Sequence, residues 1–387
     1  MKKFLAFVMA ASMALSLAAC GGSSASTATS TTTEATSEAA ASTSGSKTDV
    51  AFVTDVGNID DQSFNQYTWQ GVQDFCSANS LNANYYRPTE DSDAARLEQM
   101  DNAVNDGAKS IVVAGYLFGS AIAEAQAKYP DVQFLALDVS TADLGDKAPT
   151  SNTALITYKE EQAGYLAGYA AVKDGYTKLG FLGGMAVPAV IRYGYGYVQG
   201  ADAAAKELGT NVDINYFYGG QFYGDANITS RMEGWYANGT QIVFACGGGI
   251  YTSAVEAALK NNGYVVGVDV DQNYIGANGV EKDGYAYNPF ITSAMKGLTE
   301  AVNTALSDIE AGDWSDIAAS NGNFGLEDGD YIGLPTDDDS WNFESFTKDE
   351  YEAVKAKIAS GEITVDNSSD DATKPTVSEF TTVTYIQ

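Results

Sequence analysis

Residues 54–66 read TDVGNIDDQSFNQ, and this stretch decides the fold and points to the function. It follows the apolar run VAFV at residues 50–53, which predicts a buried strand. Ser63 and Gln66 have the spacing of a capping box, and apolar residues at helical spacing follow them. The stretch therefore predicts the turn from a first strand to a first helix. In an open α/β sheet this turn lies at the carboxyl edge, where ligands bind.

Strands and helices are predicted to alternate along the rest of the chain. Apolar runs predict strands at 50–54, 84–86, 110–114, 133–137, 153–157, 178–182, 213–218, 241–245 and 264–268. Helical patterns separate these strands, and Ile291–Ile309 reads as one long amphipathic helix. About 340 residues follow residue 47, which is more than one hydrophobic core usually holds. We therefore predict an α/β fold made of two doubly wound lobes, each with a parallel sheet.

The amino terminus has the pattern of a secretory signal. Lys2 and Lys3 precede an apolar segment, Phe4 to Leu17, which is too short to span a bilayer as a mature helix. The segment ends in LAAC at residues 17–20, which resembles a bacterial lipobox. An ordinary signal peptide with an incidental cysteine is the alternative. The Ser, Thr and Ala residues that follow, up to residue 47, predict a disordered linker.

Composition excludes several classes of function. The formal charge is −30, so electrostatic binding to nucleic acid or to an anionic membrane surface is not expected. The chain has no histidine, no CxxC pair and no phosphate-binding loop of the G-x-x-x-x-G-K-[ST] type. We therefore expect no catalytic residue, no metal and no cofactor. Cys76 and Cys246 are expected to be buried free thiols.

The first motif resembles the signature of the basic membrane protein family of substrate-binding lipoproteins, which includes the PnrA-like proteins. The likeness continues through QAGYLAG at 162–168, LGGM at 182–185, FACGGG at 244–249 and GVDVDQ at 267–272. It ends near TSAMK at 292–296 and KIASGEI at 357–363. The first motif is specific, whereas the glycine-rich motifs alone are weak evidence.

The resemblance implies a type I periplasmic-binding-protein fold, in which short crossings between the lobes form a hinge. We place the crossings near 152–158, near 284–291 and within 312–335. The expected first lobe is 48–155 plus 288–312, and the expected second lobe is 156–287 plus part of 313–365. Residues 366–387 are expected to be an acidic tail. The signal peptide would be 1–19, and residues 20–47 would hold the lipidated Cys20 and the linker.

Three carboxylates close apolar strands and are candidate ligand contacts. These are Asp55, Asp138 and Asp269, which would meet at one edge of the two sheets. The alternative is that each aspartate caps only its own turn or the next helix. The family pairs the positions of Asp55 and Asn65 in base recognition. It places those of Asp269 and Lys296 near the ribose, although Lys296 could equally form a structural ion pair.

Aromatic side chains and glycines complete the expected site. Phe64 is a candidate stacking platform for a base, with a role in the core of its helix as the alternative. The resemblance implies a second aromatic from the other lobe, for which Phe222 is the best candidate and Tyr193 and Tyr223 are reserves. Strand-end glycines, among them Gly115, Gly184, Gly247 and Gly248, would let backbone donors approach a ligand. The family typically shows a Phe-rich turn where this chain has YGYGY at 193–197.

The resemblance implies an extracytoplasmic binding protein, anchored to the bacterial cell membrane by its lipid. Such a protein would capture a purine nucleoside (inosine, guanosine or adenosine) by closure of two lobes and deliver it to an ABC permease. We expect a monomer that is not an enzyme. The alternatives are a ligand sensor for a membrane receptor or kinase, a nucleoside-acting enzyme, and a sugar- or autoinducer-binding protein of the same fold.

Overall fold

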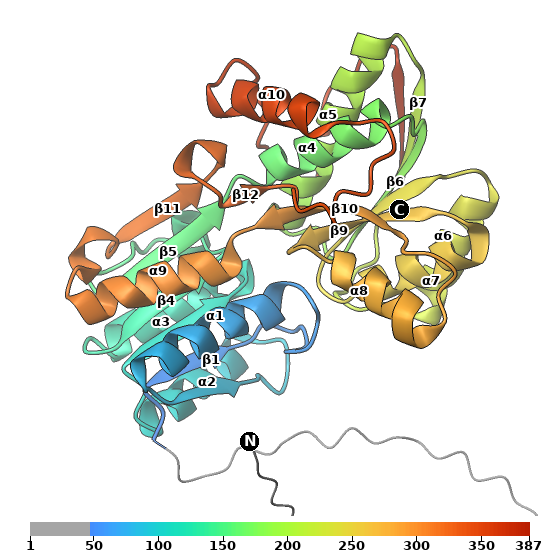
Figure 1. Cartoon of the computed structure of the whole chain (residues 1–387). Helices are drawn as coiled ribbons and strands as arrows, with labels where there is room; N and C mark the ends of the chain where they lie inside the picture. Colours follow the sequence, from blue (N-terminus) through green and yellow to red (C-terminus); the bar gives the residue numbers. More distant parts are fainter. Residues whose placement is uncertain (1–46) are drawn as a thin grey trace, which may run out of the picture. The chain divides into compact units, whose positions relative to one another are not determined.

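The computed structural model describes residues 47–387 as two lobes, each built on a parallel sheet with helices on both faces (Figure 1). The α/β fold of two doubly wound lobes is confirmed. The expected signal peptide, Cys20 and nearly all of the linker lie outside the described residues. Within residues 47–387, no helix has both the length and the apolar composition needed to cross a membrane.

The first lobe holds a six-stranded parallel sheet with the order β11-β5-β4-β3-β1-β2. Its strands are β1 (Val50–Val53), β2 (Ala83–Tyr86), β3 (Ser110–Ala114), β4 (Gln133–Leu137), β5 (Thr153–Tyr158) and β11 (Ser320–Phe324). Its helices are α1 (Phe64–Asn79), α2 (Asp93–Asn105), α3 (Gly119–Lys128) and α9 (Leu298–Ala311). Because side chains alternate along a strand, Phe52 packs under α1 and α9, whereas Ala51 and Val53 pack under α2 and α3.

The second lobe holds a seven-stranded sheet with the order β12-β10-β9-β8-β6-β7-β13, in which only β12 is antiparallel to its neighbour. Its strands are β6 (Lys178–Gly183), β7 (Val212–Tyr218), β8 (Ile242–Cys246), β9 (Tyr264–Asp269), β10 (Phe290–Lys296), β12 (Ile332–Gly333) and β13 (Thr381–Ile386). Its helices are α4 (Glu160–Lys173), α5 (Pro188–Leu208), α6 (Ala226–Ala237), α7 (Tyr251–Asn261), α8 (Asn273–Asn278) and α10 (Lys348–Ala359). Helices α4 and α5 cover one face and α6 and α7 cover the other.

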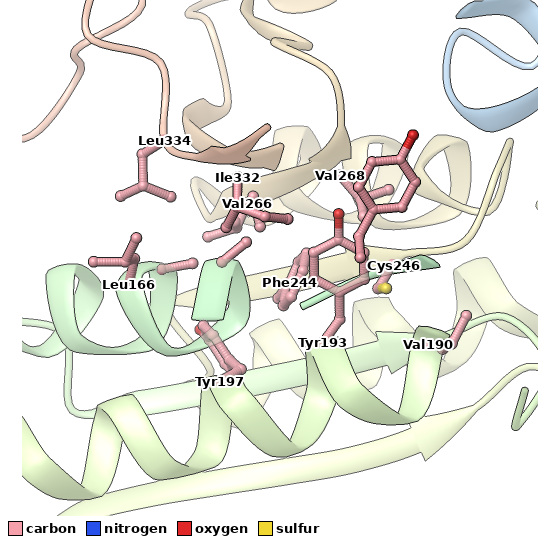
Figure 2. Close-up of a cluster of buried hydrophobic side chains, with 14 of the residues drawn as sticks. Leu166, Val190, Tyr193, Tyr197, Phe244, Cys246, Val266, Val268, Ile332 and Leu334 are labelled. Atoms are coloured by element: carbon pink, nitrogen blue, oxygen red, sulfur yellow. The ribbon is translucent and has the colours of Figure 1, made fainter. Parts of the chain in front are cut away.

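Helices α4 and α5 pack unusually closely because glycines line their contact. A Cβ atom on Gly164 would lie 2.1 Å from the carbonyl oxygen of Tyr193, and one on Gly168 would lie 2.1 Å from that of Tyr197. Neither glycine therefore tolerates even a methyl group. This contact holds the tyrosines of α5 against Phe244 in the core beneath the sheet, as Figure 2 shows.

Three segments connect the lobes, at Lys159 between β5 and α4, at Gly297 between β10 and α9, and at 325–331 between β11 and β12. The third lies within the predicted range. The first adjoins the predicted 152–158, which is mostly strand β5, whereas the second comes after β10 and not at 284–291. Lys159 forms an ion pair with Glu327, which ties the first crossing to the third.

Two sequence-based assignments are wrong. The predicted helix Ile291–Ile309 is strand β10 followed by α9, so residues 290–296 belong to the second sheet and not to the first lobe. Six of the seven residues of β10 are buried, which removes the polar face that a surface helix requires. The acidic tail, to which the sequence assigned no structure, contains β13, which extends the second sheet beside β7. β11, at 320–324, joins the first sheet.

Candidate functional site

A cavity lies between the two sheets, at the carboxyl ends of their strands. About 650 Å³ of space, part of it open to solvent, lies between its lining atoms. Eight of the nine predicted ligand residues line it, namely Asp55, Phe64, Asn65, Asp138, Phe222, Gly247, Asp269 and Lys296. The ninth, Gly184, does not line it. The predicted residues therefore meet at the carboxyl edges of the two sheets, as expected of parallel strands.

The turn after β1 forms a compact group of hydrogen bonds on the first lobe. One carboxylate oxygen of Asp55 accepts from the backbone N–H of Gly57 at 2.6 Å and from the side-chain amide of Asn65 at 2.9 Å. A Cβ on Gly57 would lie 2.4 Å from that amide nitrogen, so the turn needs glycine. Burial raises the pKa of Asp55. Asp55 therefore does serve its own turn, and it also fixes Asn65 beside the cavity.

Asp61 begins helix α1, as expected of a carboxylate just before the amino end of a helix, whereas the predicted capping box of Ser63 does not form. The Asp61 carboxylate accepts from the backbone N–H groups of Ser63, Asn65 and Gln66 at 2.9–3.1 Å. A carboxylate binds these donors better than a hydroxyl does, because the amino end of a helix favours negative charge. The Ser63 hydroxyl is left free to donate to Asp269 of the second lobe, at 2.5 Å. Burial raises the pKa of Asp61 to about 6.

Lys296 lies at the centre of a second polar group, which both lobes build. Its ammonium lies 2.5 Å from a carboxylate oxygen of Asp138, 3.5 Å from one of Glu160 and 3.8 Å from one of Asp269. All four side chains are at most 9% exposed. The three carboxylates raise the pKa of Lys296 although burial alone would lower it. Lys296 therefore forms the structural ion pair that was one of its two expected roles, and it also lines the cavity.

Asp138 and Asp269 do not cap the turns that follow them. They bond across the cavity, to Lys296 and to Ser63 respectively. Both have left-handed backbone conformations, with φ of +56° and +67°. Such conformations cost about 1–3 kcal/mol each and tend to cluster at ligand sites. Burial raises the pKa of both carboxyl groups, and Lys296 opposes that shift.

Two phenylalanines face the cavity from opposite lobes. Phe64 is the first residue of α1, and its ring centre lies 4.6 Å from the ammonium of Lys296. Phe222 lies in the loop between β7 and α6. A Cβ on Gly184 would lie 2.5 Å from the Phe222 ring, and one on Gly247 would lie 3.2 Å from it. The predicted glycine Gly184 therefore makes room for Phe222 and does not itself face the cavity.

Hydrogen bonds close the lobes over one side of the cavity. Besides the bond from Ser63 to Asp269, the backbone carbonyl of Gln62 accepts from the side chain of Gln272 at 3.0 Å. The side-chain oxygen of Gln62 accepts from the Tyr274 hydroxyl at 2.6 Å. Gln62 has φ of +55°, so its backbone is held in a strained conformation at this bridge.

Sequence reasoning missed several residues around the cavity. Those that line it are Asp61, Tyr116, Leu117 and the start of α5 at 187–190. Glu160 and Arg192 lie behind Lys296, joined at 2.6 Å. The signal that could have found the start of α5 is the one used for Asp55, since this helix also follows a strand end. Cys76 and Cys246 are buried free thiols as expected, and Cys246 lines the cavity.

Two parallel-sheet lobes that enclose a cavity with a few polar groups among apolar and aromatic side chains define a two-lobed ligand-binding protein. Residues 48–369 match the family described as ABC transporter substrate-binding protein PnrA-like, and the chain belongs to this family. It is 31% identical to the ABC transporter nucleoside-binding protein BmpA of Lactococcus lactis subsp. cremoris, over 69% of this chain and 76% of that protein. It is 28% identical to basic membrane protein A1 of Borrelia garinii subsp. bavariensis, over 64% and 68%.

Solved structures agree on the fold. An ABC transporter solute-binding protein from Aeropyrum pernix K1 superposes with a TM-score of 0.70 at 21% identity, covering 84% of this chain and 95% of that chain. At this identity the likeness shows the fold alone. Membership of the family makes the chain the solute-binding component of an ABC transporter, extracytoplasmic and associated with the membrane, with a small-molecule ligand and a permease as its partners.

Proposed function

We propose that the protein captures a purine nucleoside between its lobes and delivers it to its ABC permease. The observation that carries the proposal is the pair Phe64 and Phe222, one from each lobe, beside two separate polar groups in one cavity. A flat base offers two apolar faces for aromatic rings and a polar edge for directional donors and acceptors. The pair Asp55 and Asn65 supplies such groups, and the carboxylates around Lys296 suit a ribose diol.

The nucleoside assignment is tested by calorimetry on the full chain. We expect heat from inosine, guanosine or adenosine and none from monosaccharides. The relative from Lactococcus lactis is named a nucleoside-binding protein, which supports this choice of ligands. Binding of a monosaccharide with no response to any nucleoside would instead favour a sugar-binding protein of the same fold.

We further propose that the protein is not an enzyme and returns its nucleoside unchanged. Burial raises the pKa of the Cys246 thiol, which keeps it protonated and poorly nucleophilic. Within residues 47–387, no group of three His, Cys, Asp or Glu side chains is placed to hold a metal ion. Chromatography after prolonged incubation should recover intact nucleoside, and release of free base would contradict this proposal.

We propose that lipidated Cys20 anchors a monomer to the outer face of the cell membrane. The support is the sequence LAAC at 17–20 and the polar segment that separates it from the folded lobes. Cys20→Ser should move the protein out of the membrane fraction while nucleoside affinity stays unchanged. A variant that remains in the membrane after a high-salt wash would contradict the lipid anchor. Light scattering of the released variant should give the mass of one chain.

A further inference from the structure

One side chain of the cavity carries a hydroxyl group with no partner. Tyr193 lies on α5 and is 1% exposed, and it lines the cavity beside Val190, Cys246 and Val268 (Figure 2). Its hydroxyl makes no hydrogen bond within residues 47–387. A buried hydroxyl without a partner costs about 1–3 kcal/mol. Phenylalanine would fill the same space without that cost, so the hydroxyl calls for an explanation.

The position of Tyr193 shows which end of the cavity its hydroxyl serves. The ammonium of Lys296 lies 5.8 Å from the centre of the Tyr193 ring. At the same end, Oδ1 of Asp138 is also buried and without a hydrogen-bond partner among the described residues. Burial and the nearby carboxylates raise the pKa of Tyr193, so its hydroxyl keeps its proton and can donate.

The two unpartnered groups have complementary needs. Oδ1 of Asp138 can only accept a hydrogen bond while the carboxylate is ionised, whereas the Tyr193 hydroxyl can donate one or accept one. A ligand hydroxyl satisfies both, because it donates to the carboxylate and accepts from the phenol. A sugar with neighbouring hydroxyls presents such groups. The edge of a base has its own partners in Asp55 and Asn65 of the other polar group.

We propose that the Tyr193 hydroxyl reads the sugar hydroxyls of the ligand and lets the site discriminate a ribonucleoside from its 2′- or 3′-deoxy analogue. This inference rests on the proposed nucleoside function. A site built to bond a ligand hydroxyl rejects an analogue that lacks it, because the buried groups of the site are then left unpaired. Tyr193 is thus a specificity-determining residue, placed there by the close packing of α4 on α5.

Tyr197 provides a matched control on the same helix. It is 0% exposed, its hydroxyl also has no partner within the described chain, and both tyrosines pack their rings against Phe244, at 5.9 Å and 5.3 Å between centres. Tyr197 does not line the cavity, and in Figure 2 it lies further along α5. Tyr193→Phe and Tyr197→Phe therefore each remove one hydroxyl from the same core. Only the hydroxyl of Tyr193 is proposed to contact the ligand.

The test compares affinities for inosine, 2′-deoxyinosine and 3′-deoxyinosine by calorimetry on the full chain and both variants. We expect Tyr193→Phe to weaken inosine binding by about 2- to 10-fold, as the loss of one neutral hydrogen bond predicts. The loss should be much smaller for at least one deoxy analogue. Tyr197→Phe should leave all three affinities unchanged. Neither variant should melt below the parent protein without ligand, since each removes an unpaired buried group.

Three outcomes would overturn the inference in different ways. Equal affinities for Tyr193→Phe and Tyr197→Phe would mean that the hydroxyl does not touch the ligand. A uniform loss for inosine and both deoxy analogues would mean that Tyr193 contacts the base or only shapes the cavity. If the parent protein binds none of these nucleosides, nor guanosine or adenosine, the proposed function fails and this inference fails with it.

Discussion

The two polar groups of the cavity are built in opposite ways. Asp55, Asp61 and Asn65 lie within eleven consecutive residues of one lobe, and the two carboxylates there accept from backbone N–H groups close by in the chain. Asp138, Glu160, Asp269 and Lys296 come from both lobes, and three carboxylates share one ammonium. In that assembled group, oxygens of Asp138 and Glu160 are left without hydrogen bonds.

This difference separates two roles. The local group makes its internal hydrogen bonds within its own turn, so it keeps its shape whether the lobes are open or closed. The assembled group is complete only when the lobes meet, and the unpartnered Oδ1 of Asp138, which lines the cavity, gains from a ligand that donates to it. Closure and ligand binding should therefore be coupled mainly through the assembled group, as expected of two lobes that close around a ligand by a hinge motion.

The largest effect is expected from Lys296→Met, which removes the one cation shared by three buried carboxylates. Removing one partner of a buried ion pair costs about 3–5 kcal/mol, because the remaining charge is left uncompensated. Urea unfolding without ligand should show this loss, and nucleoside affinity should fall with it. Lys260→Met is the control, since Lys260 pairs with Glu233 and Glu256 on the surface and is 53% exposed. Its loss should stay below about 1 kcal/mol.

Equal losses for the Lys296 and Lys260 variants would break the comparison, because Lys296 would then behave as a surface lysine. The same result would remove the reason to regard the assembled group as the part of the cavity that senses closure.

Phe64→Ala tests whether the ring next to Lys296 belongs to the ligand or to the core. Loss of one stacking face should weaken nucleoside binding about 5- to 150-fold, from about 1–3 kcal/mol per stacked base. Unliganded stability should barely change, because Phe64 is only partly buried. Phe75→Ala, on the same helix but 5% exposed, should instead cost about 3–5 kcal/mol of stability. A stability loss of that size for Phe64→Ala with unchanged affinity would place Phe64 in the core.

Glu161→Gln tests a buried carboxylate next to Glu160 of the assembled group. Burial, and then the neighbouring Glu160, raise the pKa of Glu161 from 4.5 to about 7. Between these values the unfolded chain loses the proton before the folded protein does, so Glu161 destabilises the fold progressively as pH rises. The variant should gain up to about 3 kcal/mol at pH 8 and nothing at pH 4. Urea midpoints across pH measure the difference.

Glu350 gives the opposite sign and serves as the control. Hydrogen bonds from Thr347 hold the pKa of Glu350 below its usual value, so its stabilising effect is present at neutral pH and is lost on acidification. Glu350→Gln should therefore lose stability above pH 4.5, where Glu161→Gln gains it. A flat pH profile for Glu161→Gln would mean that Arg192, 4.0 Å away, compensates the buried charge fully.

Local patterns predicted most of the fold, and long-range pairing accounts for what they missed. Strand β3 is a short apolar run that is buried throughout, so its signal lies in its own five residues. Strand β10 has the same apolar character but continues almost directly into α9, and periodicity alone could not separate them. Strand β13 pairs with β7, whose residues lie 169 positions earlier in the chain. No pattern within the acidic tail itself predicts that it pairs with β7.

The site shows the same limit. Strand-end aspartates could be found because parallel strands end at one edge. The pairing of Asp55 with Asn65 is implied only by the resemblance to the family. The capping box at Ser63 failed because a stronger acceptor, Asp61, lies two residues before it. The contacts of Lys296 with Asp138 and Glu160 could not be predicted, because they depend on how two separately folded sheets meet.

The smallest effect is expected from Tyr274→Phe, which removes one hydrogen bond between the lobes. The Tyr274 hydroxyl donates to Gln62, next to the local group, at 2.6 Å. One such bond contributes about 0.5–1.5 kcal/mol, so ligand should dissociate about 2- to 10-fold faster while association is unchanged. Tyr287→Phe is the control, since its hydroxyl donates its one hydrogen within the second lobe, to the backbone carbonyl of Gly263 at 2.7 Å or that of Ala258 at 3.1 Å. That variant should lose stability without faster dissociation. If Tyr274→Phe weakens binding as much as Lys296→Met, closure depends on the bridge beside the local group, and the division of roles between the two polar groups is wrong.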